Sequence, residues 1–119
     1  MLNQIVLVGR LTKDIEVKTG ESGMKYSDIS IAVPRSFKNA DGVYDTDFIT
    51  FRAFDMVAAN TSEYCKKGDI IGVKGRLQSS SFEREDGTKE FRIEPIAEKV
   101  TFLSSRSNET KNKDDVERD

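Results

Sequence analysis

The chain has 119 residues, with 19 basic and 21 acidic side chains, a single cysteine and no histidine. This length supports one domain with one core, and it is too short for a two-domain enzyme. The lone Cys65 excludes an internal disulfide and a cysteine-rich metal site, and it fits a reducing cytosol. Without histidine the chain lacks imidazole metal ligands and the usual general base near neutral pH, which argues against an enzyme.

No apolar run approaches the roughly 20 residues needed to cross a bilayer, and the N-terminus lacks the pattern of a signal peptide. We therefore expect a cytoplasmic protein that does not contact a membrane. The net charge of −2 counts mildly against nucleic-acid binding. An acidic protein can nevertheless present one positive face, so the total charge does not decide the function.

Two stretches early in the chain are predicted to be strands, whose side chains alternate between two faces. Residues 3–12 form the first, in which Gly9 marks a bulge or bend of the kind that small barrels need. Residues 26–33 form the second, and Pro34 stops or bends it because proline cannot donate to a sheet ladder. A loop is predicted over residues 36–45.

A third stretch, Asp47 to Phe54, has two unlike faces. Because side chains alternate across a strand, one face carries only apolar groups, from Ile49, Phe51 and Ala53. The other face carries two aromatic rings, a hydroxyl and a cation, from Phe48, Thr50, Arg52 and Phe54. Rings flanked by a guanidinium suit single-stranded nucleic acid, a polyanion with stackable bases. Burial of both faces between two layers explains this stretch, taken alone, equally well.

One helix is predicted, over residues 56–67, with Asp55 as its N-cap and Gly68 just beyond its C-terminal end. Lys66 and Lys67 would complement the negative end of the helix dipole. The helical spacing predicts that Tyr64 and Cys65 lie on the face that packs against the core.

The second half of the chain predicts further strands. A strand over residues 69–78 projects Lys74 and Arg76 from the same side. Residues 79–85 and 88–96 flank a hairpin turn, and a final strand covers residues 99–103. Residues 104–119 form an acidic tail with almost no apolar side chain, which we expect to be disordered. The folded domain is thus predicted to span residues 1–103.

This order of elements predicts an all-β fold, a five-stranded Greek-key OB-fold barrel. A single helix would lie between its third and fourth strands, followed by an extended β-hairpin. Strand spacing alone equally allows another small barrel or a sandwich. The expected core residues are Ile5, Leu7, Ile29, Ile31, Val33, Ile49, Phe51, Ile71, Val73, Leu77, Val100 and Phe102.

Several motifs resemble the bacterial single-stranded DNA-binding proteins of the homotetrameric type. They are MLNQIVLVGRLTKD, IAVPRSF, TDFITFRAF, KKGDIIGVKGRLQ and SFEREDGTKEFRIEPIAEKVTFL, which agree in order and spacing over residues 1–103. The resemblance implies an OB-fold that binds single-stranded DNA with little sequence preference and assembles as a homotetramer. It also implies a role in replication, recombination or repair in a bacterium or phage.

The resemblance further implies which residues contact DNA. Four aromatic positions stack on bases in the family, and they fall on Phe37, Phe48, Phe54 and Phe82. Family members commonly have tryptophan at several of these positions, whereas this chain has none. Basic residues that follow the DNA backbone fall on Arg10, Lys13, Arg35, Arg52, Lys74 and Arg76.

The tail departs from the family, whose members usually end in an acidic tip with a terminal phenylalanine that recruits replication and repair enzymes. Residues 104–119 are acidic but lack that hydrophobic ending, so we do not expect such partners. No catalytic constellation, cofactor site or metal site is expected either. Two alternatives stay open: an RNA-binding OB-fold of the cold-shock type, and an OB-fold used as a protein-interaction module.

Overall fold

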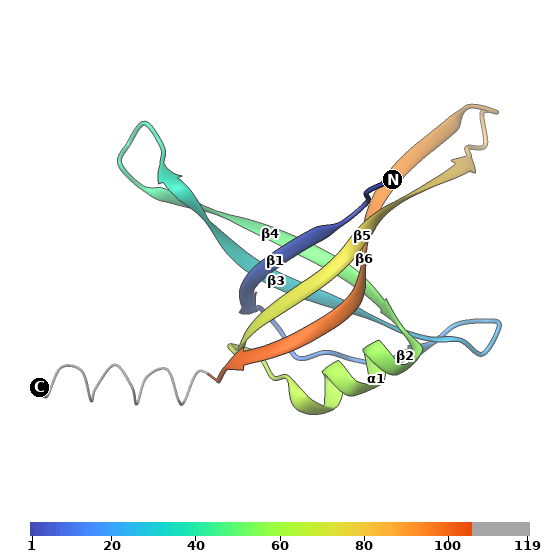
Figure 1. Ribbon diagram of the computed structural model, residues 1–119. Helices are drawn as coiled ribbons and strands as arrows, with labels where there is room; N and C mark the ends of the chain where they lie inside the picture. Colours follow the sequence, from blue (N-terminus) through green and yellow to red (C-terminus); the bar gives the residue numbers. More distant parts are fainter. Residues whose placement is uncertain (106–119) are drawn as a thin grey trace, which may run out of the picture.

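The computed structural model describes residues 1–105, and within that range it contains one sheet and one helix (Figure 1). In chain order the elements are β1 (Ile5–Leu11), β2 (Lys18–Thr19), β3 (Lys25–Lys38), β4 (Tyr44–Phe54), α1 (Asp55–Tyr64), β5 (Ile70–Glu83) and β6 (Lys89–Ser104). The tail predicted to be disordered lies outside the described residues from position 106 onward. No helix within residues 1–105 has the length and apolar character required to cross a membrane.

Five of the strands close into a barrel. The hydrogen-bonded order is β1-β5-β6-β4-β3, and a second pairing of β1 with β3 completes the ring. Only the contact between β4 and β6 is parallel. The two-residue β2 pairs with the first residues of β3, before the stretch that pairs with β1. The single helix follows β4, the third strand of the barrel. This closed Greek-key arrangement is the predicted OB-fold, and it excludes the sandwich that strand spacing alone allowed.

The barrel interior is filled by apolar side chains that alternate along each strand. The fully buried large side chains include Leu11, Ile29, Ile31, Phe51, Ile71 and Val73. Most of the predicted core is thereby confirmed, but two assignments were wrong. Leu77 is 43% exposed because β5 has by then left the barrel for the hairpin, and Phe102 is 46% exposed because it lines a groove beside α1.

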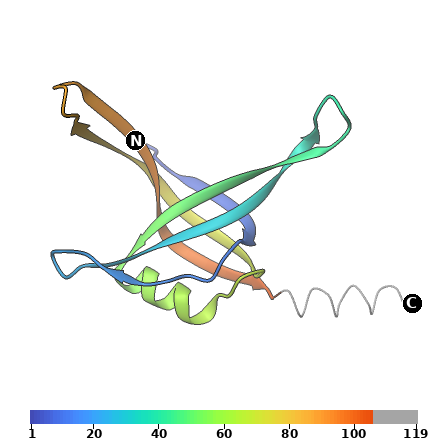
Figure 2. The same ribbon diagram turned by 180° about the vertical axis from the view of Figure 1, so that it is seen from behind.

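Two long hairpins extend from the barrel on the side opposite α1, and both views show them (Figures 1 and 2). The first joins β3 to β4, so half of the loop predicted over residues 36–45 belongs to strands, and the connection covers only residues 39–43. Pro34 does not end the strand, because it sits where the register of β3 against β4 becomes irregular. The second hairpin joins β5 to β6, and the two strands predicted over residues 88–103 are one continuous strand.

The helix is shorter than predicted and ends at Tyr64. Two carboxylates take up the backbone N–H groups that follow: Asp69 accepts from Lys66 at 2.7 Å and Asp14 accepts from Lys67 at 2.8 Å. These bonds replace a further helical turn, so neither lysine lies in the last turn. At the other end Asp55 is the first helical residue and not the N-cap.

The two core assignments on the helix have opposite outcomes. Cys65 is 3% exposed, as predicted, and burial raises the pKa of its thiol. The thiolate is therefore disfavoured, which agrees with a packing role. Tyr64 is 69% exposed, so its predicted burial was wrong. It is the last helical residue, and its ring lies beside the groove between α1 and β6.

A bulge at Glu98 lets β6 bend around the barrel. Lys74 of β5 pairs with Lys99, but the next residue, Gly75, pairs with Ala97, which leaves one residue of β6 without a partner. The backbones approach so closely here that a Cβ on Gly75 would lie 1.9 Å from the carbonyl oxygen of Ile96. Glycine is thus required at this position for barrel closure.

We predict that Gly75→Ala lowers the free energy of unfolding by at least about 2 kcal/mol, because backbone atoms must move to admit the methyl group. Gly72→Ala on the same strand is the control. Its Cβ would meet only side chains at ordinary distances, the nearest being Leu103 at 3.7 Å. Urea unfolding of both variants measures the difference. Equal stabilities for the two would contradict the close approach.

Candidate nucleic-acid interface

The outward face of β4 presents the aromatic rings that the sequence predicted. Phe51 and Ala53 are fully buried, so the alternate residues Phe48 and Phe54 face away from the core. Phe48 is opposite Ala32 on β3, and it is 74% exposed. Phe54 is partly buried at the end of the strand that joins the helix. A large ring this exposed in mid-sheet is available to a ligand.

The other two predicted stacking rings lie on the hairpins. Phe37 is on β3 beyond Pro34 and is 63% exposed. Phe82 is near the far end of β5 and is 39% exposed. The four rings thus extend from the barrel surface onto both projecting arms.

Arg52 lies between the two β4 rings but is not free. Its Nε donates to Asp28 at 3.0 Å, and Glu94 on β6 is 3.5 Å away. The guanidinium also lies over the Tyr26 ring, 4.9 Å from its centroid. Arg52 therefore ties β3, β4 and β6 together across the outer surface of the barrel.

Two further predicted cations also have partners. Arg35 on β3 donates to both carboxylate oxygens of Asp47 on β4, with its shortest bond at 2.9 Å. Asp45 is a second acidic neighbour of Arg35, at 3.7 Å. Arg76 on β5 donates to Gln78 at 2.7 Å and lies 3.9 Å from Glu98. Three of the six cationic groups predicted to follow the DNA backbone, those of Arg35, Arg52 and Arg76, thus have a carboxylate of the same chain within 4 Å.

The remaining predicted cations lie elsewhere on the surface. Arg10 on β1 donates to the carbonyl oxygen of Gly68 at 2.7 Å. Lys74 on β5 is exposed opposite Val6 of β1, two strands away from β4 around the barrel. Of the predicted cations, Arg52 shares the outward face of β4 with Phe48. Arg35 lies on the other face of the β3–β4 hairpin, because its partner Asp47 alternates with Phe48 along β4. Arg10 is opposite Ala32, the residue that is opposite Phe48, whereas Lys74 lies two strands away from β4.

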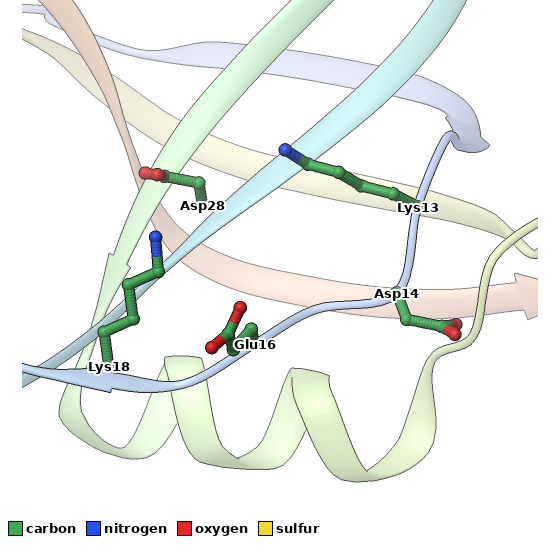
Figure 3. A pocket seen from close by; sticks show the side chains of 5 residues that line it. All are labelled: Lys13, Asp14, Glu16, Lys18 and Asp28. Atoms are coloured by element: carbon green, nitrogen blue, oxygen red, sulfur yellow. The ribbon is translucent and has the colours of Figure 1, made fainter.

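Lys13 lines a small polar pocket between the segment after β1 and the outer face of β3 (Figure 3). The pocket is about 90 Å³ in volume, and its lining residues are Lys13, Asp14, Glu16, Lys18 and Asp28. Two cations and three carboxylates nearly cancel, so this pocket is not an anion site by itself.

Two residues near the rings were not predicted from the sequence. Tyr26 is opposite Phe54 in the β3–β4 register and carries Arg52 over its ring. Arg92 on β6 lies over the Phe82 ring, 4.5 Å from the centroid. Alternation within each strand gives the outward side, but the cross-strand partner requires the register, which the sequence did not provide.

A closed OB-fold barrel with exposed rings and arginines on its outer strands belongs to the class of OB-folds that bind oligonucleotides. The profile of the single-strand binding protein family matches residues 2–103. The chain therefore belongs to the single-strand binding protein family.

Curated relatives agree with this assignment. Single-stranded DNA-binding protein B of Bacillus subtilis strain 168 is 39% identical over 109 residues, which cover 92% of this chain and 96% of the relative. Single-stranded DNA-binding protein 1 of Staphylococcus aureus strain MSSA476 is 40% identical over 119 residues, which cover 100% of this chain and 73% of the relative. The protein of the same name from strain COL is 43% identical over 107 residues, covering 90% and 64%.

The Arg35–Asp47 pair makes a prediction about pH. The hydrogen bond from Arg35, aided by its charge, holds the pKa of Asp47 below its ordinary value. Because the folded-state pKa is lowered, the pair stabilises the fold above the unfolded pKa and ceases to do so as pH falls through the folded pKa. We expect Arg35→Gln to raise the pKa of Asp47 toward its ordinary value in an NMR carboxyl titration.

Asp86 provides the control within the same titration. Hydrogen bonds from Thr88 lower its pKa, independently of Arg35. This pKa should be the same in wild type and in Arg35→Gln. An unchanged Asp47 titration in the variant would show that the ion pair does not persist in solution.

Proposed function

We propose that this protein binds single-stranded DNA with little sequence preference and without catalysis, by stacking bases on Phe37, Phe48, Phe54 and Phe82. The observation that carries the proposal is the 74% exposure of the Phe48 ring in the middle of a barrel strand. The relatives are named for single-stranded DNA binding, which supports this choice of ligand.

Stacking explains why these positions are aromatic. A solvated phenylalanine on a sheet contributes nothing to the core, whereas a base placed on its face removes apolar area of both from water. Every base has such a face, so stacking tolerates any sequence. Exposed rings on the barrel and on both arms allow the strand to bind at several places.

The charges make a different contribution. Arg35 and Arg52 already pair with carboxylates, so a phosphate must compete with Asp47 or Asp28 for them. Phosphate binding then exchanges one anionic partner of the arginine for another. The electrostatic gain is therefore smaller than it would be for a free cation. We therefore assign the larger share of the affinity to stacking, with the arginines orienting the strand.

In the cell such binding protects exposed strands from nucleases and keeps them free of hairpins during replication, recombination or repair. We infer that the protein acts in the cytoplasm, together with the DNA. An RNA-binding role of the cold-shock type stays as the second candidate, because stacking alone does not distinguish the two polymers.

We also propose that copies of the chain assemble through the outer surface of β1, as in a homotetramer. Val6 and Val8 are 60% and 51% exposed on this strand. Beside them is a largely apolar hollow of about 250 Å³, lined by Val8, Gly9, Arg10, Ala32, Pro34 and Ile70. A second copy would cover the apolar surface that Val6 and Val8 expose on β1.

We expect Phe48→Ala to weaken binding of fluorescent oligo-dT by about 1–3 kcal/mol without changing thermal stability, because the ring touches a base but not the core. The matched control is Tyr64→Ala, which removes a ring that is 69% exposed on α1, away from the hairpins. Equal affinities for the two variants would refute base stacking at β4. Tighter binding of an equal-length RNA would favour the second candidate.

Replacing Val8 with Glu should reduce the mass measured by light scattering at a given protein concentration, since a buried unpaired carboxylate opposes assembly. Met56→Glu places the same charge on a residue that is 69% exposed on the helix, and it should leave the mass unchanged. A wild-type chain that is monomeric at micromolar concentration would overturn the proposed assembly.

A further inference from the structure

We propose that Arg92 is a further DNA-contacting residue, which forms with Phe82 a composite platform for one nucleotide. This inference rests on the proposed function and deepens it. The base would lie on the open face of the Phe82 ring, and the guanidinium on the other face would donate to a backbone phosphate.

The register of the β5–β6 hairpin places the two side chains together. Ser80 pairs with Arg92 and Phe82 pairs with Glu90, so the ring and the guanidinium are diagonal neighbours on one face of the hairpin. The guanidinium carbon is 4.5 Å from the ring centroid, within the range of a cation–π interaction. The ring limits the arginine to few rotamers before any ligand arrives, which reduces the entropic penalty of binding.

Arg92 also differs in its partners from the other arginines within residues 1–105. Arg35, Arg52, Arg76 and Arg84 each have a carboxylate within 4 Å, and Arg10 donates to a backbone carbonyl. The Phe82 ring is the only partner of Arg92 in the described part of the chain. Its donors can therefore pair with a phosphate without displacing a carboxylate.

The position of Arg92 continues the aromatic face of the barrel. Alternation along β6 puts Arg92 and Glu94 on the same side of the strand. Glu94 is the residue that lies 3.5 Å from Arg52, at the centre of the β4 rings. A DNA strand stacked on Phe48 and Phe54 thus reaches Arg92 by following β6 outward along the hairpin.

The test compares Arg92→Gln with Arg84→Gln in the full chain. Both variants remove one positive charge from the same hairpin, but Arg84 already pairs with Glu90 at 3.0 Å. Oligo-dT affinity is measured at several salt concentrations. We expect Arg92→Gln to bind roughly tenfold more weakly at low salt, as for the loss of a charged hydrogen bond. Its slope of log affinity against log salt should be shallower by about 0.7, because one phosphate fewer is neutralised.

The oligo-dT affinity of Arg84→Gln should stay within about twofold of the wild-type affinity, because the Arg84 guanidinium is already compensated by a carboxylate. Arg92→Lys should restore the salt slope, since it keeps the charge. In a Phe82→Ala background, Arg92→Gln should reduce the oligo-dT affinity by less, because the guanidinium is no longer held by the ring.

Three results would overturn the inference. Equal binding by Arg92→Gln and Arg84→Gln, with wild type still binding oligo-dT, would leave the proposed function intact and remove Arg92 from it. Tighter binding by Arg92→Gln would mean that the guanidinium blocks the ring. No binding of oligo-dT by wild type would refute the proposed function and this inference with it.

Discussion

The alternation of side chains along β4 is the constraint on which both the fold and the site depend. Phe51 must lie in the barrel interior, where it is fully buried, for the five strands to close around a core. The same alternation then forces Phe48 and Arg52 onto the outer surface. A register shift of one residue would exchange the two sets, exposing the core ring and burying the guanidinium. The register that buries the core therefore also exposes the rings.

Barrel closure also explains the arms and the charges. The bulge opposite Gly75 bends β6 enough to reach β4, and β5 and β6 then continue past the barrel as a hairpin. On the barrel surface, closure brings Glu94 of β6 within 3.5 Å of Arg52. The resulting network ties three strands together and compensates the cation. A protein with net charge −2 can then hold arginines beside its exposed rings without a strongly basic surface.

The features that could be predicted from the sequence are those that depend on local periodicity. The two faces of β4, most of the core and the OB-fold order follow from alternation and turn residues, and the structure confirms them. The sequence did not predict features that depend on partners distant in the chain. Asp14, just after β1, accepts from Lys67, just before β5, and helps to end the helix early, a bond between residues 53 positions apart. The pairing of Arg52 with Asp28 likewise requires the β3–β4 register.

Proline and hairpin geometry account for the other differences. Pro34 was expected to stop or bend its strand, but β3 continues through it to Lys38, and the register against β4 shifts directly after the proline. Leu77 matched the core pattern of β5, yet the pattern does not tell where a strand leaves the barrel. The same limit applies to the site. Exposure of Phe37 and Phe82 follows from the lengths of the arms, which local signals placed partly in loops.

Base stacking on the outer face of β4 is tested most directly by photocrosslinking to oligo-dT in which single thymines are replaced with 5-iodouracil, a base that couples to an aromatic ring stacked on it. Mass spectrometry of the crosslinked peptides identifies the rings that touch DNA. We predict crosslinks at Phe48 and Phe54, with none at the buried Phe51. Crosslinks confined to Tyr64 and Phe102, in the groove beside α1, would contradict stacking on β4.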